Sequence, residues 1–297
     1  MTLYAVRHAT RFSYEKPISF ARCNLRLKPI DWPGQRLSSH HLAVHPGGQL
    51  SPAPQRSTLV NITRLVIPQA AGHIEIVSEA EVEVWHQPAF PSPEDPTVAA
   101  VAEMARTSLE VSDLAPANFL YPSPSIPADD SIAAWALDSL TAQRPVLEAA
   151  SEFSRRIHEE FRFDPDATRT ETPPAEAFAA RAGVCQDFSQ IMICGLRAAG
   201  LPAAYVSGYI RTIPPPGQAR LQGADATHGW VMVWCGRDRG WIGLDPTNGI
   251  AMGDDHIVMA VGRDYLDIAP IDGVFTGHGE QEITVEVDVE PLPSVCP

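Results

Sequence analysis

The stretch GVCQDFSQIMICGLRAAG, residues 183–200, decides the fold of the chain, because it places a cysteine directly before an apolar helical pattern. The pattern predicts a helix that begins at Cys185 and stops at Gly200. A lone cysteine is most often a small buried hydrophobe. At a helix N-terminus, however, unpaired N–H groups stabilise a thiolate, which favours a nucleophile. Cys194 lies in the middle of the same helix and is expected to be inert.

A thiolate nucleophile needs a base, and His228 is the best placed of the ten histidines. It begins the predicted strand 228–234, and the turn GRDRG, residues 236–240, folds the strand 240–245 back against it. Asp245 therefore returns to the same end of the hairpin as His228. A carboxylate there fixes the imidazole tautomer, so the sequence predicts a nucleophile, base and orienting group formed by Cys185, His228 and Asp245.

Composition excludes several classes of partner. The formal charge of -14 repels nucleic acid and anionic lipid, and the opening MTLYAVRHATRF has no apolar signal segment. Five cysteines without a CxxC pair suggest free thiols in a reducing compartment, so we expect a cytoplasmic protein. There is no GxGxxG motif, P-loop or EF-hand, so no cofactor is predicted. The sequence predicts no oligomeric state.

The pattern of apolar residues divides the chain into a β region and a mixed region. Alternating segments predict N-terminal strands at 4–14, 38–46, 57–67 and 74–85. A proline-rich segment, 86–96, follows, and helical spacing then predicts helices at 97–109, 129–140 and 146–161. Further strands are predicted at 202–210, 228–234, 240–245 and 283–290, the last returning to one of the sheets.

This order of elements predicts an α+β fold rather than a doubly wound parallel sheet. The predicted parts are an N-terminal antiparallel β domain over 1–90, a catalytic core over 91–275, and a C-terminal strand and tail over 276–297. We expect the β domain to cover one wall of the site or to hold a macromolecular substrate.

The segments 183–210 and 228–248 resemble the bacterial branch of the transglutaminase-like superfamily, whose core is related to papain-type cysteine proteases. The N-terminal strands resemble the β domain that accompanies this branch. The resemblance implies Cys185 as nucleophile, His228 as base and acid, and Asp245 as orienting group. It further implies supporting or lining roles for four motif residues, namely Gln186, Asp187, Tyr209 and Trp230. Two positions depart from the residues this branch often carries, Ser189 and Gly229, the latter standing where the branch often has alanine.

The chemistry predicted from these residues is acyl transfer at an amide through a thioester, most simply hydrolysis of a peptide, protein or small amide. With an amine as acceptor, the same site gives a protein-glutamine gamma-glutamyltransferase. Only Lys16 and Lys28 are available for self-cross-linking, which favours hydrolysis.

Two other interpretations remain open. A catalytically silent binding module has the same fold, and Cys185, His228 and Asp245 together offer S, N and O ligands to zinc. A second group, His40, His41 and His45, lies on a predicted strand whose successive side chains point to opposite faces, so we expect no metal site there.

Overall fold

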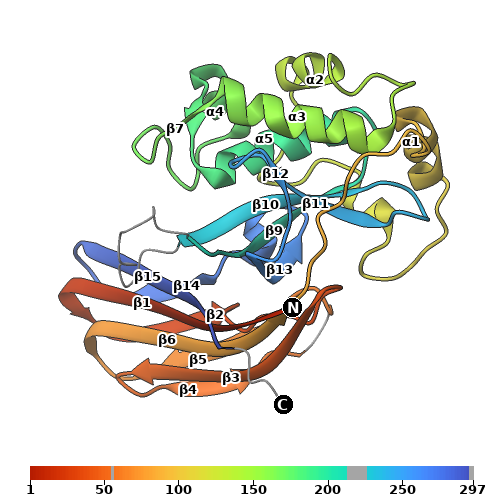
Figure 1. The fold of residues 1–297 in the computed structure, drawn as a ribbon. Helices are drawn as coiled ribbons and strands as arrows, with labels where there is room; N and C mark the ends of the chain where they lie inside the picture. Colours follow the sequence, from red (N-terminus) through yellow and green to blue (C-terminus); the bar gives the residue numbers. More distant parts are fainter. Residues whose placement is uncertain (55–56, 213–225, 294–297) are drawn as a thin grey trace, which may run out of the picture.

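A computed structural model describes residues 1–54, 57–212 and 226–293 of the chain. It confirms the α+β class: antiparallel sheets come first, and a mixed helical and β core follows. Figure 1 shows three tiers, with the helices above, a central sheet in the middle and the long N-terminal strands below. The helices are α1 (Val98–Arg106), α2 (Asp130–Leu137), α3 (Val146–Glu160), α4 (Pro174–Ala180), α5 (Cys185–Ala198) and α6 (Tyr265–Ile268), with a short 3-10 helix at Pro116–Phe119.

The N-terminal region forms two four-stranded antiparallel sheets, ordered β15-β1-β6-β3 and β14-β2-β5-β4. Alternating apolar residues of the strands, including Phe12, Leu65 and Ile74, are buried between them. The strands are β1 (Thr2–Ile18), β2 (Phe20–Leu25), β3 (Gln35–His45), β4 (Gln49–Pro52), β5 (Thr63–Ile67), β6 (Ala71–Val84), β14 (Ile271–Thr276) and β15 (Gln281–Pro291). One prediction was too long, because residues 57–62 form a loop and the strand begins only at Thr63.

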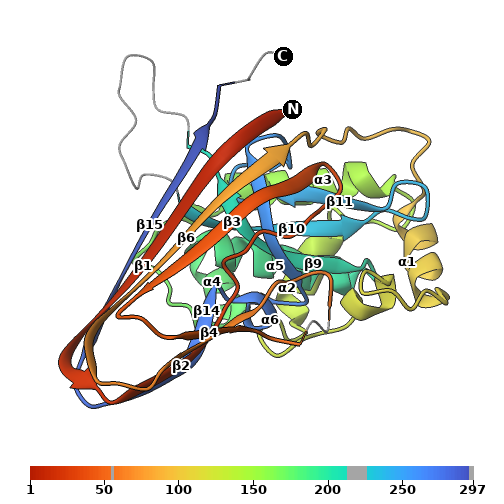
Figure 2. The same ribbon diagram turned by 90° about the horizontal axis from the view of Figure 1, so that it is seen from below.

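The end of the chain returns to the N-terminal sheets, as predicted for 283–290. β15 pairs along β1, with Val285 opposite Thr10, and β14 pairs with β2. Figure 2 shows β15, β1, β6 and β3 running side by side. β14 lies inside the residue range predicted for the core, yet its partner strand is N-terminal. The residue boundaries of the predicted domains stay a prediction.

The central sheet has the order β12-β11-β10-β9-β13. Its strands are β9 (Ala203–Ile210), β10 (Ala226–Trp234), β11 (Trp241–Asp245), β12 (Ile250–Ala251) and β13 (His256–Gly262), and a separate short pair joins β7 (Arg162–Phe163) to β8 (Ala182–Gly183). α5 packs on this sheet through buried Phe188, Ile191 and Leu196. A Cβ at Gly195 would lie 2.6 Å from both Ala136 Cβ and Phe153 Cζ, so glycine allows α2 and α3 to approach α5 closely.

The lower sheets and the central sheet share a buried contact. Tyr4, Val82 and Val289 of the N-terminal sheet pack against Tyr209 and Ile257 of the central sheet. At the same contact, buried His8 of β1 bonds through Nδ1 to the Tyr209 hydroxyl at 2.9 Å. Tyr209 therefore joins the β domain to the strand that precedes the His228 hairpin.

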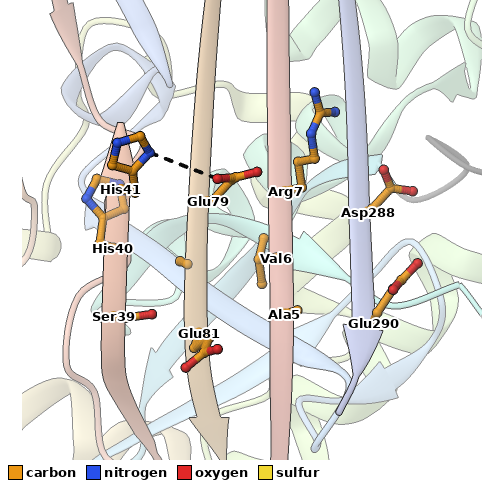
Figure 3. A pocket seen from close by; sticks show the side chains of 11 residues that line it. Ala5, Val6, Arg7, Ser39, His40, His41, Glu79, Glu81, Asp288 and Glu290 are labelled. Atoms are coloured by element: carbon orange, nitrogen blue, oxygen red, sulfur yellow. Dashed lines mark ion pairs between the residues drawn. The ribbon is translucent and has the colours of Figure 1, made fainter. Parts of the chain in front are cut away.

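Figure 3 shows His40 and His41, neighbouring residues of β3. His41 is exposed and lies 4.0 Å from Glu79 on the outer face of the sheet, whereas His40 bonds to Ser78 Oγ at 3.0 Å. They border a pocket of about 510 Å³, whose lining does not include Cys185, His228 or Asp245. Among the described residues, no helix is long and apolar enough to span a bilayer.

Candidate active site

Cys185 is the first residue of α5, as predicted, and its side chain is partly exposed. Asp187 closes this helix end, because its Oδ2 accepts hydrogen bonds from Val184 N at 2.8 Å and from Thr168 Oγ1 at 2.6 Å. Burial raises the pKa of the Asp187 carboxyl, although these hydrogen bonds oppose the rise. Gln186 donates to the Thr170 carbonyl at 2.8 Å. Both residues thus fasten the segment 168–170 to the helix that carries Cys185.

The β10–β11 hairpin brings His228 and Asp245 together, as the predicted turn requires. Val231 pairs with Leu244 across the antiparallel strands, and His228 Nε2 lies 2.7 Å from Asp245 Oδ2. Both residues are buried, Asp245 completely. Because Nε2 is bonded to Asp245, the other ring nitrogen, Nδ1, remains for the Cys185 sulfur.

The charges of this group are coupled. Burial works to lower the pKa of His228, but the hydrogen bond that its ring donates to Asp245, the interaction with the Cys185 side chain and the charges of both raise it to about 10. Burial likewise works to raise the pKa of Asp245, and hydrogen bonds from His228, His256 and Asn248 hold it well below its usual range. The arrangement therefore favours a protonated imidazole between an ionised carboxylate and the thiol.

Two residues that the sequence did not single out complete the carboxylate's surroundings. Asn248 donates from Nδ2 to Asp245 Oδ2 at 2.7 Å, and its backbone N–H donates to Oδ1 at 3.2 Å. His256 Nε2 lies 3.3 Å from the same Oδ2, while His256 Nδ1 accepts from Gly253 N. Asn248 lies in the tight turn after Asp245, and this turn is a sequence signal that could have identified it. His256 begins β13 and looks like any strand residue in the sequence.

Trp230 is fully buried and supports His228 rather than facing solvent. Its ring is stacked on the imidazole at 6.0 Å between centroids and meets His256 edge-on at 5.2 Å. Gly208 permits this packing, since a Cβ there would lie 2.4 Å from the indole. Tyr209, by contrast, does not touch the His228 and Asp245 pair and contacts His8 of the β domain.

Of the two positions that depart from the residues expected from the resemblance, Gly229 directly follows His228, and Ser189 lies one turn after Cys185 in α5. A Cβ at Gly229 would lie 2.2 Å from the hydroxyl of Tyr205, so the phenol occupies the space an alanine would fill. Burial and the neighbouring Cys185 raise the pKa of Tyr205 well above its ordinary value. Ser189 is completely buried in α5.

The structure brings together a different set of possible metal ligands from the set predicted from the sequence. Among the described residues, the ligand atoms that converge within 4.8 Å belong to His228, Asp245 and His256, without Cys185. The Nε2 proton of His256 points at Asp245, because Nδ1 already accepts from Gly253 N. The donors of this group are therefore engaged in hydrogen bonds to one carboxylate, a pattern that fits a positioned imidazole better than a ligand set.

The other described cysteines are free and buried. Burial raises the pKa of Cys194, that of Cys23 to about 11 and that of Cys235 to about 12. Cys296 lies outside the described residues. Of the four cysteines that the structure describes, Cys185 alone is partly exposed.

Comparison with known proteins agrees with this architecture. The family model described as the transglutaminase-like superfamily matches residues 133–246, and that of the bacterial transglutaminase-like N-terminal region matches 4–83. A solved structure from Cytophaga hutchinsonii, described as "a Putative Cysteine Protease", superposes with a TM-score of 0.78 at 18% identity over 100% of this chain and 92% of that one. This likeness shows the shared fold.

Relatives in sequence extend along nearly the whole chain. Uncharacterized proteins of Mycobacterium tuberculosis and Mycobacterium bovis are 33% identical over 294 residues, 97% of this chain and 93% of theirs. A protein-glutamine gamma-glutamyltransferase of Pseudomonas aeruginosa is 33% identical over 111 residues, 36% of this chain and 16% of that protein. The chain therefore belongs to the transglutaminase-like superfamily, with the N-terminal region of its bacterial branch followed by the transglutaminase-like core.

Proposed function

We propose that the protein is a thiol-dependent acyl-transfer enzyme that hydrolyses amide or peptide bonds. One observation carries the proposal. Cys185 stands at a helix N-terminus, and the His228 ring is oriented by the buried Asp245 carboxylate, with 2.7 Å between Nε2 and Oδ2. A nucleophile, a base and an orienting group in this order form the set that covalent catalysis needs.

The reaction follows from these positions. The Cys185 thiolate attacks the amide carbonyl carbon, and the backbone N–H of Cys185 stabilises the oxyanion. The C–N bond then breaks as the His228 imidazolium gives its proton to the departing amine, leaving a thioester on Cys185. Water attacks the thioester, His228 takes the water proton, and the acid is released with the thiol restored. Asp245 keeps the imidazole oriented throughout.

Transfer to an amine is the second candidate, because of the partial similarity to a protein-glutamine gamma-glutamyltransferase. The two activities share every step up to the thioester and differ only in whether water or an amine attacks it. Peptide, protein and small-amide substrates are all compatible with the proposal.

Product analysis tests the proposal. A panel of peptide amides and glutamine peptides is incubated with the protein, with and without a primary amine, and the products are identified by mass spectrometry. Hydrolysis predicts carboxylic acids in both conditions, whereas cross-linking predicts the amine adduct. Cys185→Ser must abolish turnover and Cys194→Ser must keep it. Loss of turnover on removal of bound zinc, with Cys185→Ser still active, would contradict the proposal in favour of metal chemistry.

A further inference from the structure

A small pocket lies where the β domain meets the core, next to the strand that carries the proposed base. It has a volume of about 200 Å³ and is lined partly by core residues Thr227 and Tyr265. Thr227 directly precedes His228. The Tyr265 ring lies 6.1 Å between centroids from the ring of Tyr205, and Cys185 contributes, after burial, to raising the pKa of both phenols.

The opposite wall of the pocket comes from the β domain and carries a row of apolar side chains. Alternate residues of β15 face inward, and the two nearer its end, Val287 and Val289, are buried against the central sheet. The two before them on the same face, Ile283 and Val285, remain 50% and 47% exposed and border the pocket. Phe12 of β1 also lines it. The apolar face of β15 therefore continues beyond the part that the central sheet covers, and its uncovered residues border the pocket.

The pocket is uncharged, although the chain carries a formal charge of -14. No Asp, Glu, Lys or Arg of the described residues lines it. Its polar members are Thr10, Thr227, Tyr265 and His8, and burial lowers the pKa of His8 to about 4, so that this ring is neutral near pH 7. An uncharged wall of this kind rejects a cationic or anionic side chain, because neither finds a partner for its charge.

We propose that this pocket is a specificity site that accepts one large uncharged apolar side chain of the amide substrate. The inference rests on the proposed function, which supplies the neighbouring thiol. The volume suits one side chain rather than a cofactor. It also gives the β domain a role in catalysis, since β1 and β15 form the wall that selects the substrate.

Affinity labelling of Cys185 tests the pocket without requiring turnover. The full chain is treated with iodoacetamide and with its N-isobutyl, N-(4-guanidinobutyl) and N-(2-carboxyethyl) derivatives. Rates at each cysteine are measured by peptide mass and divided by the rate with glutathione. We expect the isobutyl reagent to label Cys185 roughly tenfold or more faster than either charged reagent.

Val285→Arg places a charge in the wall and is expected to remove the isobutyl preference while leaving the iodoacetamide rate unchanged. Val274→Arg is the matched control, because Val274 is an exposed valine of β14, a strand of the other N-terminal sheet, and lies outside the pocket lining. Ile283→Ser, a milder change, is expected to reduce the preference about threefold, and thermal unfolding checks that all variants fold.

Equal labelling by all reagents, or a preference that survives Val285→Arg, overturns the proposal. Failure of the proposed function has a different signature: Cys185 would then react with iodoacetamide no faster than Cys194, while the ratios between reagents would still report on the pocket.

Discussion

His228 Nε2 lies 2.7 Å from Asp245 Oδ2, and the other carboxylate oxygen, Oδ1, accepts the backbone N–H groups of Thr247 and Asn248. The hairpin thus fixes the carboxylate first and the carboxylate then fixes the imidazole. The Asp245→Asn side chain has nearly the same shape as aspartate, but it presents a neutral amide to the His228 ring in place of a carboxylate. We expect amide turnover to fall by on the order of 10³–10⁴-fold, because the imidazole loses its orienting charge and its tautomer. Steady-state kinetics measures this, with Asp238→Asn, an exposed residue of the same hairpin turn, as the control. Equal losses in both variants would argue against the orienting role.

His256 is expected to stabilise the fold through Asp245. His256→Ala removes a buried hydrogen bond to a charged group and leaves a cavity beside Trp230. We expect the free energy of unfolding to drop by roughly 2–4 kcal/mol. His41→Ala, an exposed histidine 4.0 Å from Glu79, should change it by less than about 0.5 kcal/mol. Urea unfolding at pH 7 compares them, and similar values for the two variants would contradict a structural role of His256.

Acid stability should depend on His8. Burial lowers the pKa of this ring to about 4 from an ordinary value of 6.5, so the folded state binds its proton less readily than the unfolded state. The stabilisation is therefore present above pH 6.5 and is lost as the pH falls towards 4. Between pH 7 and pH 5 we expect His8 to account for roughly 2 kcal/mol of lost stability.

Urea unfolding at the two pH values, in wild type and in His8→Gln, isolates this contribution. His86 has the same direction of shift and remains in both proteins, so it cancels in the comparison. A pH dependence that is the same in the variant as in the wild type would show that His8 does not titrate as described.

Gly229→Ala tests the contact between Gly229 and Tyr205. The new methyl group would stand 2.2 Å from the Tyr205 hydroxyl, and the buried phenol must shift. We expect a loss of about 1–3 kcal/mol in the free energy of unfolding. Gly72→Ala in β6 is the control, since nothing lies within 4 Å of the added methyl group. An unchanged thermal midpoint in Gly229→Ala would show that the phenol has room to move.

Local patterns in the sequence predicted the elements that position the site. The apolar period after Cys185 located α5, and the GRDRG turn located the antiparallel return that brings Asp245 to His228. The prediction that 283–290 returns to a sheet was also confirmed, although only the structure shows that β1 is its partner. Partners far apart in sequence are set by packing, which periodicity does not encode.

The surroundings of the site were harder to predict for the same reason. His256 contacts Asp245 although β13 and β11 are separated by β10 and β9 in the sheet, and the strand pattern of β13 gives no hint of this contact. Tyr209 lies at the contact with His8 rather than beside His228, a placement that depends on the β domain. The catalytic roles of Cys185, His228 and Asp245 and the reducing compartment stay predictions.

The pairing of Cys185 with His228 is the central claim, and cysteine-resolved alkylation tests it most directly. The rate of iodoacetamide alkylation is measured by peptide mass for each cysteine from pH 5 to pH 10, in wild type and in His228→Ala. Since the pKa of His228 is raised to about 10, the protonated ring can stabilise a thiolate across the neutral range. We expect Cys185 to react at least about tenfold faster than Cys194 at pH 7, and His228→Ala to remove this advantage. Equal rates at the two cysteines in the wild type would contradict the account and favour a catalytically silent binding module.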